Sequence, residues 1–168
     1  AIKAELVTDP IWDVSGPVDT LYIGGGTPSR LGGAGVGEVI AAVSEVYKNI
    51  TVKSTEITIE ANPEDVSPET ARGWVEAGVG RVSLGVQSFD PGVLRWMHRS
   101  HTVETVHAAM SELRGAGVSD ISLDLIFALP ETLQRDWDAD LEQAVALEPD
   151  HLSLYGLTVE PQTPLGRW

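Results

Sequence analysis

Thr20-Leu21-Tyr22-Ile23-Gly24-Gly25-Gly26-Thr27-Pro28-Ser29 predicts a short apolar strand that runs directly into three glycines and a Thr-Pro-Ser turn. Because glycine has no Cβ, the backbone of this loop can adopt positive φ and a ligand can approach the main chain itself. Exposed N–H groups in such a loop suit a carboxylate, and exposed C=O groups suit an ammonium. A tight strand-to-helix turn without any ligand is the alternative interpretation, and the loop alone does not separate the two.

The rest of the chain alternates between strand and helix patterns. We expect strands over residues 19–23, 56–61, 81–86, 120–127 and 151–157. We expect helices over residues 37–47, 68–77, 91–97, 103–115 and 132–147, and a weakly amphipathic helical tail within residues 1–12. Repeated β-α alternation without hairpin signals predicts an α/β fold with a parallel sheet in one domain, residues 1–168. Five units are too few for an eight-fold barrel.

The five strands share one asymmetry between their two faces. One face is aliphatic: Leu21, Ile23, Ile57, Ile59, Ala61, Val82, Leu84, Val86, Leu123, Leu125, Phe127, Leu152, Leu154. The other is polar or small: Thr20, Tyr22, Gly24, Thr58, Glu60, Asn62, Ser83, Gly85, Gln87, Ser122, Asp124, Ser153, Tyr155. The aliphatic face must meet the helices, whereas the polar face must line a partly wet interior because buried unpaired carboxylates are costly. Glu60 or Asp124 alone favours a structural carboxylate, but five strands in phase predict a ligand site at their carboxyl ends.

Other polar and aromatic residues favour structural roles. His98 and His101 flank Arg99 in a polar segment and are expected to be solvated, and the four histidines have no metal-ligand spacing. Trp74, Trp96 and Trp137 are expected to be helix-packing residues. The acidic side chains expected to be solvated on the last helix are Asp136, Asp138, Asp140 and Glu142.

Composition excludes several classes of function. A net charge of −14 argues against nucleic acid or an anionic membrane as a partner, and no apolar run approaches the length of a membrane span. We expect a cytoplasmic protein without a secretory leader. The absence of cysteine excludes a disulfide and a thiolate-held cluster on this chain. Both ends look cut from a longer protein.

Four motifs in register make the chain resemble the radical S-adenosylmethionine core of the oxygen-independent coproporphyrinogen III oxidase family. They are residues 22–29, Glu60-Ala61-Asn62-Pro63, Gly85-Val86-Gln87-Ser88-Phe89 and Asp124-Leu125-Ile126-Phe127-Ala128-Leu129-Pro130. The ending Leu154-Tyr155-Gly156-Leu157-Thr158-Val159-Glu160-Pro161 is more similar to the haem-chaperone branch of that family. The family's usual Gly-Leu-Pro after the fourth strand is Ala128-Leu129-Pro130 here, which we interpret as a minor change.

The resemblance implies a partial (β/α)6 barrel with five strands present and with the first strand and the cluster loop missing. It implies that Gly24, Gly25, Gly26, Thr27 and Pro28 meet the methionine amino group of S-adenosylmethionine. By the same resemblance, Glu60 bonds the ribose, Arg99 bonds the methionine carboxylate, and Gln87 and Asp124 complete the polar shell. A 4Fe–4S cluster would belong to the parent protein only, so this fragment is expected to be inactive and to self-associate along the edge of its first strand.

Two classes of function stay open for the parent. One is a haem-binding protein that delivers haem to accepting proteins, which the ending favours. The other is an oxidase that carries out radical oxidative decarboxylation of a porphyrinogen. A phosphate-binding barrel enzyme would require basic residues around the glycine loop, where only Arg30 lies.

Overall fold

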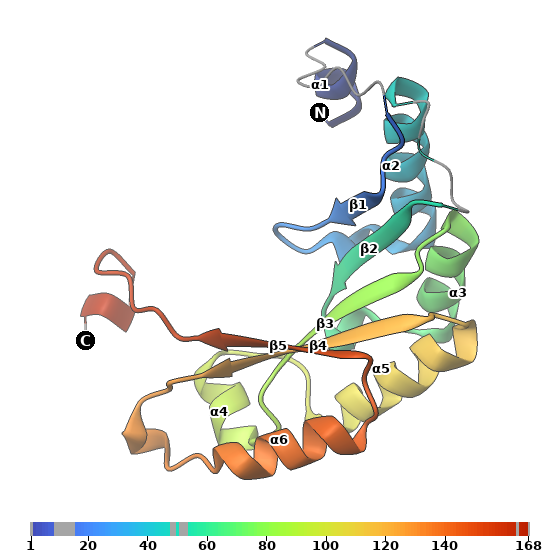
Figure 1. Ribbon diagram of the computed structural model, residues 1–168. Coiled ribbons are helices and arrows are strands. Elements are labelled where there is room, and N and C mark those ends of the chain that lie inside the picture. The colour runs from blue at the N-terminus through green and yellow to red at the C-terminus, as the bar shows by residue number, and fades with distance from the viewer. Residues whose placement is uncertain (1, 9–15, 48–49, 51–53, 164, 168) are drawn as a thin grey trace.

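The computed structural model describes residues 2–8, 16–47, 50, 54–163 and 165–167. Five parallel strands form one sheet in the order of the chain: β1 (Thr20–Ile23), β2 (Glu56–Ala61), β3 (Arg81–Gln87), β4 (Asp120–Phe127) and β5 (His151–Gly156) (Figure 1). The predicted α/β class and parallel sheet are confirmed. Sequential strand order requires every connection to return on the same side of the sheet, which is the winding of a barrel.

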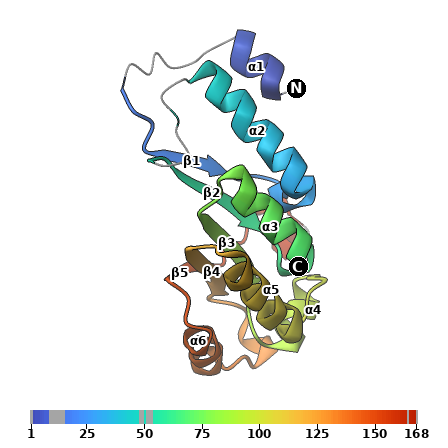
Figure 2. The ribbon, with the colours of Figure 1, turned by 90° about the vertical axis from the view of Figure 1, so that its right-hand side faces the viewer.

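The helices lie on one side of the curved sheet and leave the other side concave (Figures 1 and 2). Their bounds are α1 (Ile2–Thr8), α2 (Gly32–Val46), α3 (Pro68–Ala77), α4 (Pro91–Trp96), α5 (Val103–Ala116) and α6 (Trp137–Ala146). Short 3₁₀ turns cover Pro28–Leu31, Pro63–Asp65, Glu131–Leu133 and Leu165–Arg167. In the described part of the chain, every helix is too short or too polar to cross a membrane.

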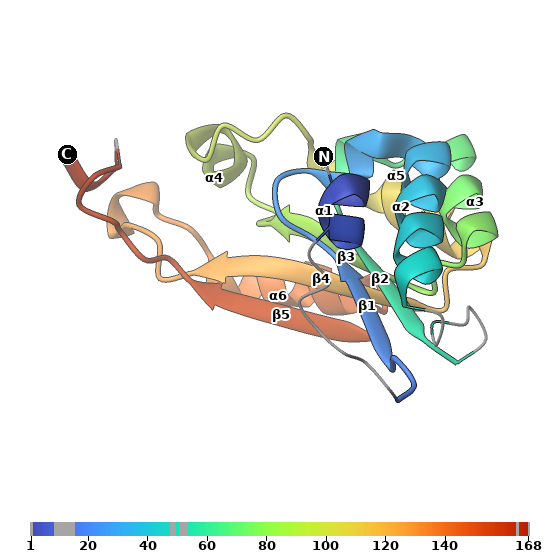
Figure 3. The ribbon, with the colours of Figure 1, turned by 90° about the horizontal axis from the view of Figure 1, so that it is seen from above.

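The aliphatic strand face packs under the helices as predicted. Ile59, Val82, Leu84 and Leu123 are fully buried, and the core continues into Trp74 of α3. Two residues of the predicted face are exceptions, since Phe127 is 41% exposed and Leu154 is 46% exposed. Both lie at the β5 end of the sheet, from which the C-terminal segment extends away from the helices (Figure 3).

Side-chain caps begin α3, α4 and α5. Ser67 and Thr102 each form a capping box with the threonine three residues later, and Asp90 accepts hydrogen bonds from two N–H groups of α4. Gly78, directly after α3, adopts the left-handed conformation that closes the helix.

Two predicted helix boundaries were wrong. The helix predicted over residues 132–147 begins only at Trp137, because Gln134 has a φ of 49° and Asp136 caps the helix by accepting a hydrogen bond from Ala139 N–H at 3.1 Å. The helix predicted from Gly37 begins at Gly32. An early glycine of α2 allows a close crossing, since a Cβ on Gly33 would lie 2.6 Å from the Cα of Gly73 on α3. Tertiary packing therefore overrides the poor helix propensity of these glycines.

Candidate functional site

The carboxyl ends of the strands surround a cavity of about 220 Å³, which we call the strand-end cavity. It is lined by Gly26, Thr27, Pro28, Ser29, Glu60, Ala61, Asn62, Ser83, Gly85, Arg99 and Asp124. Six of the nine site residues predicted from the sequence therefore lie around one cavity. Gly24, Gly25 and Gln87 lie beside it.

The glycine loop after β1 combines close packing with an unusual backbone. A Cβ on Gly24 would lie 2.7 Å from Cε1 of Tyr22 and 2.8 Å from Oε1 of Glu60, so a larger residue cannot be accommodated there without displacement. Gly25 and Gly26 have φ values of 81° and 71°, in the region that favours glycine. Position 24 is thus restricted by space, and positions 25 and 26 by conformation.

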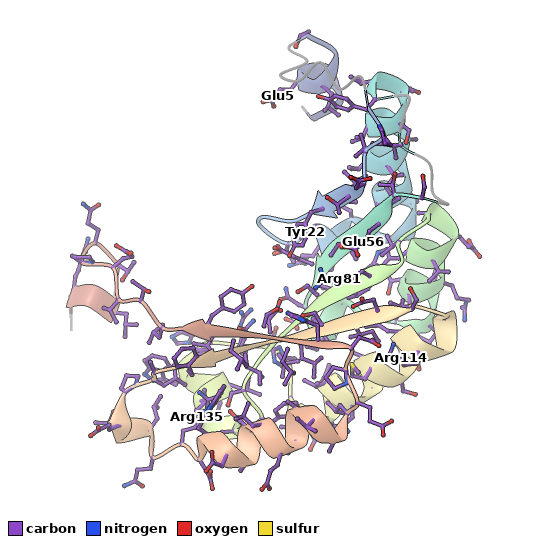
Figure 4. The ribbon with its side chains drawn as sticks, in the orientation of Figure 1. Glu5, Tyr22, Glu56, Arg81, Arg114 and Arg135 are labelled. Carbon is purple, nitrogen blue, oxygen red and sulfur yellow. The ribbon has the colours of Figure 1, made fainter. Side chains whose placement is uncertain are left out.

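Glu60 is held from two sides at the mouth of the cavity. The Tyr22 hydroxyl donates to Oε1 at 3.0 Å, and the Gly25 N–H donates to Oε2 at 3.0 Å. Each carboxylate oxygen has two lone pairs, so both keep capacity for a further donor. Burial and the Glu60 carboxylate together raise the pKa of Tyr22 to about 12, which keeps the phenol a donor at neutral pH. Figure 4 shows Tyr22 on β1, next to the glycine loop.

Asp124 of β4 brings a second carboxylate to the same cavity. The Ser83 hydroxyl lies 2.9 Å from both of its oxygens. Burial raises the pKa of Asp124, the Ser83 and Ser153 hydroxyls lower it, and the nearby charge of Glu60 raises it further, so that the net shift is upward. Two neighbouring acidic groups make this cavity suited to a cationic ligand.

Arg99 comes from a loop, and Gln87 from the last position of a strand. Arg99 lies between α4 and α5 and lines the strand-end cavity. Gln87 ends β3 with a φ of 69°, at a shift in register between β3 and β4. Its amide does not line the cavity: a Cβ on Gly85 would lie 2.9 Å from Nε2 of Gln87, so the amide lies over that glycine.

Five lining residues were not predicted as site residues, and one of them, Ala61, was placed on the aliphatic face. Asn62, Ser83 and Gly85 were placed on the polar face, and that face was the signal that could have included them. Ser29 had no such signal. It is buried, and its hydroxyl donates to Asp65 at 2.6 Å, which joins the end of the glycine loop to the segment after β2.

Two residues expected to be solvated are buried. The His101 ring has no exposed surface, and its Nε2 lies 3.0 Å from the Val86 carbonyl oxygen. Asp140 is 2% exposed and accepts hydrogen bonds from the Ser88 hydroxyl at 2.7 Å and the Phe89 N–H at 2.8 Å. Both predictions were wrong because the partners come from segments that are distant in the sequence.

Arg135 completes the environment of Asp140. Its guanidinium forms an ion pair with that carboxylate, donates to the Ile126 carbonyl at the end of β4 and lies 4.5 Å from the ring centroid of Trp137 (Figure 4). This buried pair joins the start of α6 to the ends of β3 and β4. Within the described ranges, no group of three or more histidine or acidic side chains is placed to hold a metal ion.

Comparison with known families gives one match over most of the chain. Residues 10–144 match the Radical SAM superfamily.

Among curated relatives, heme chaperone HemW from Haemophilus influenzae is 38% identical over 86% of this chain and 37% of its own length. Heme chaperone HemW from Mycobacterium tuberculosis H37Rv is 36% identical over 99% of this chain and 42% of its own length. The chain therefore spans about two fifths of the length of these relatives.

A solved structure confirms the likeness of the fold. Coproporphyrinogen III oxidase (HemN) from Escherichia coli, described as a radical SAM enzyme, superposes with a TM-score of 0.85 at 27% sequence identity. The superposition covers 99% of this chain and 38% of the oxidase.

Proposed function

Because the chain belongs to the Radical SAM superfamily, we propose that the strand-end cavity binds S-adenosylmethionine. The observation that carries this proposal is the convergence of Glu60, Asp124 and Arg99 on one cavity. S-adenosylmethionine offers a ribose diol, a carboxylate and a net positive charge at its ammonium and sulfonium, and these suit an acceptor carboxylate, a guanidinium and a second carboxylate, respectively. At about 220 Å³ the cavity is smaller than a typical ligand pocket, so the rest of the cofactor would lie along the concave face of the sheet.

Each predicted residue has a distinct part in this proposal. The remaining acceptor capacity of Glu60 suits the two ribose hydroxyls. The glycine loop, Gly24 to Pro28, offers main-chain carbonyls to the ammonium. Arg99 binds the carboxylate with the planar fork of its guanidinium. Asp124, with Gln87, would complete the polar shell and favour the cationic cofactor.

The 4Fe–4S cluster of the family does not fit this chain. The sequence has no cysteine, so it supplies no thiolate to iron. We propose that residues 1–168 are one domain of a longer protein whose other residues hold the cluster, and that this chain alone does not turn over S-adenosylmethionine.

For the longer protein we propose haem binding and delivery, with haem-accepting proteins as partners. Relatives at 36–38% identity that are named heme chaperones support this choice. The alternative is radical oxidative decarboxylation of a porphyrinogen, which the TM-score of 0.85 to coproporphyrinogen III oxidase supports. A cytoplasmic location and self-association through the edge strand β1 belong to the same proposal.

The cofactor proposal is tested by titrating the full-length, cluster-loaded protein with two ligands in a calorimeter. Glu60→Gln should weaken both S-adenosylmethionine and 5′-deoxyadenosine, because both carry the ribose diol. Arg99→Lys should weaken only S-adenosylmethionine, because 5′-deoxyadenosine lacks the amino-acid end. Each loss should be about 1.5–3 kcal/mol, as for a hydrogen bond to a charged group.

Arg30→Lys is the matched control, since Arg30 is exposed and follows the glycine loop without lining the cavity. It should leave both affinities unchanged. If Arg99→Lys weakened the two ligands equally, the placement of the carboxylate at Arg99 would be wrong. A loss caused by Arg30→Lys would show that the ligand site extends beyond the residues that line the cavity.

A further inference from the structure

The loop that carries Arg99 is held by the two residues that follow it. Within the loop, the Arg99 N–H donates to the Leu94 carbonyl at 2.9 Å, and His98 before it has a φ of 54°. The side chains of Ser100 and His101 contact the segment that follows β2. A cavity residue on such a loop is placed only as accurately as these contacts place its backbone.

Both contacts converge on the carboxylate of Glu64. The Ser100 hydroxyl donates to Oε1, and Nδ1 of His101 lies 3.3 Å from Oε2, within ion-pair distance. The other ring nitrogen of His101, Nε2, lies 3.0 Å from the Val86 carbonyl oxygen, so the buried ring is placed between Glu64 and the end of β3. Partial burial opposes ionisation of Glu64, but the Ser100 hydroxyl, the backbone and the His101 ring lower its pKa overall.

The position of Glu64 joins this contact to the site. Glu64 lies in the 3₁₀ turn Pro63–Asp65, directly after Asn62 of the strand-end cavity. Val86 lies on β3, next to Gly85 of the same cavity. The buried ring of His101 therefore bridges the ends of β2 and β3.

Arg99 has a second cavity available to it. A neighbouring cavity of about 390 Å³, between α4 and the start of α5, is also lined by Arg99, together with Leu94, Arg95 and Thr102. A long, flexible guanidinium side chain that borders two cavities needs its backbone fixed in order to favour one of them.

We propose that Glu64, Ser100 and His101 form a positioning unit that directs Arg99 into the strand-end cavity. Glu64 is the central residue because it contacts both Ser100 and His101, the two residues that follow Arg99. The unit acts through Arg99 and touches no ligand itself. This inference rests on the proposed function, since it concerns how the carboxylate of S-adenosylmethionine is recognised.

The test uses the full-length, cluster-loaded protein and calorimetric titration with S-adenosylmethionine and 5′-deoxyadenosine. Glu64→Ala should weaken S-adenosylmethionine about tenfold, the equivalent of one charge-assisted hydrogen bond, and change 5′-deoxyadenosine less than about twofold. General destabilisation would weaken both ligands, so this difference is specific to positioning. Glu64→Gln should recover part of the loss, because it keeps an acceptor for Ser100 but loses the charge that faces His101.

A double-mutant cycle shows whether the unit acts through Arg99. In the Arg99→Lys background, Glu64→Ala should weaken the binding of S-adenosylmethionine by less than about a further twofold, because the effects of residues that act as one unit are not additive. Glu69→Ala is the control, an exposed glutamate in the first turn of α3. Should Glu64→Ala fail to fold, Ser100→Ala removes a single bond of the unit and should give a smaller loss with the same ligand preference.

The outcomes separate this inference from the function on which it rests. If Arg99→Lys distinguishes the ligands but Glu64→Ala and Ser100→Ala weaken both equally, or neither, the positioning unit is refuted and the cofactor placement stands. If Arg99→Lys weakens the binding of both ligands equally, the placement of the carboxylate at Arg99 is wrong, and the proposed positioning unit is refuted with it.

Discussion

Gly73→Ala tests the close crossing of α2 and α3. A Cβ on Gly73 would lie 2.8 Å from the Cα of Gly33, and this neighbour is backbone that cannot rotate away. Carbon atoms pack at about 3.5–4.0 Å, so α2 and α3 would have to separate by roughly 1 Å. Overpacking of this kind costs about 1–3 kcal/mol, while replacing a mid-helix glycine by alanine gains about 0.8–1.0 kcal/mol in propensity. The expected net effect is a destabilisation of up to about 2 kcal/mol.

The same helix pair provides the control for the propensity gain. Gly37 of α2 would place its Cβ 3.7 Å from the Cβ of Ala77, which is ordinary contact. Gly37→Ala should therefore stabilise the protein by about 0.5–1 kcal/mol. Urea unfolding of both variants isolates the steric cost, because the propensity gain is common to them. Equal stabilities for Gly73→Ala and Gly37→Ala would refute the close crossing of the two helices.

Two further predictions concern single positions. Tyr22 should ionise with a pKa of about 12. The difference in alkaline ultraviolet absorbance between the native protein and Tyr22→Phe measures this pKa. Glu60→Gln should lower it, because the substitution removes the carboxylate that opposes ionisation. Native ionisation near 10 would show that Tyr22 and Glu60 are apart in solution. Ala128 has a φ of 57°, a conformation that costs a non-glycine residue about 1–2 kcal/mol. Glycine removes this cost but has a larger conformational entropy in the unfolded chain. The net effect of Ala128→Gly should be a stabilisation of about 0.5–1 kcal/mol. Unchanged thermal stability of Ala128→Gly would contradict the assigned backbone conformation.

The strands and the ligand face could be predicted from the sequence because both depend on local alternation. Glu60 and Asp124 are fixed by period two within a strand, so their appearance on one cavity followed from the pattern. The change at Ala128 was interpreted as minor from residue identity alone. Its positive φ could not be read from the sequence, and it makes the change a source of backbone strain.

The residues that were misjudged are those whose environment is set by distant partners. Asp140 looks like any acidic residue in the first turn of a helix, but Ser88, Phe89 and Arg135 bury it. His101 lies in a polar segment and is nevertheless packed against Val86. Periodicity carries no information about such pairings, which depend on how loops from different β-α units meet.

Residues of the site that lie within strands and residues that lie in or beside loops are held in place differently. Strand pairing sets the backbone positions of Glu60 and Asp124, and hydrogen bonds from adjacent residues of the sheet and the glycine loop hold their carboxylates. Arg99 lies in a loop and Gln87 is the last residue of β3, and the residues that follow each of them contact a carboxylate outside the cavity. Glu64 accepts a hydrogen bond from Ser100 and lies beside His101, whereas Asp140 accepts hydrogen bonds from Ser88 and Phe89. Asp140 is buried and would be costly without its donors, whereas the partly exposed Glu64 is joined to its loop by the Ser100 hydroxyl and the His101 ring. Substitution of either carboxylate should therefore disturb the loop residues of the cavity before it disturbs the strand residues.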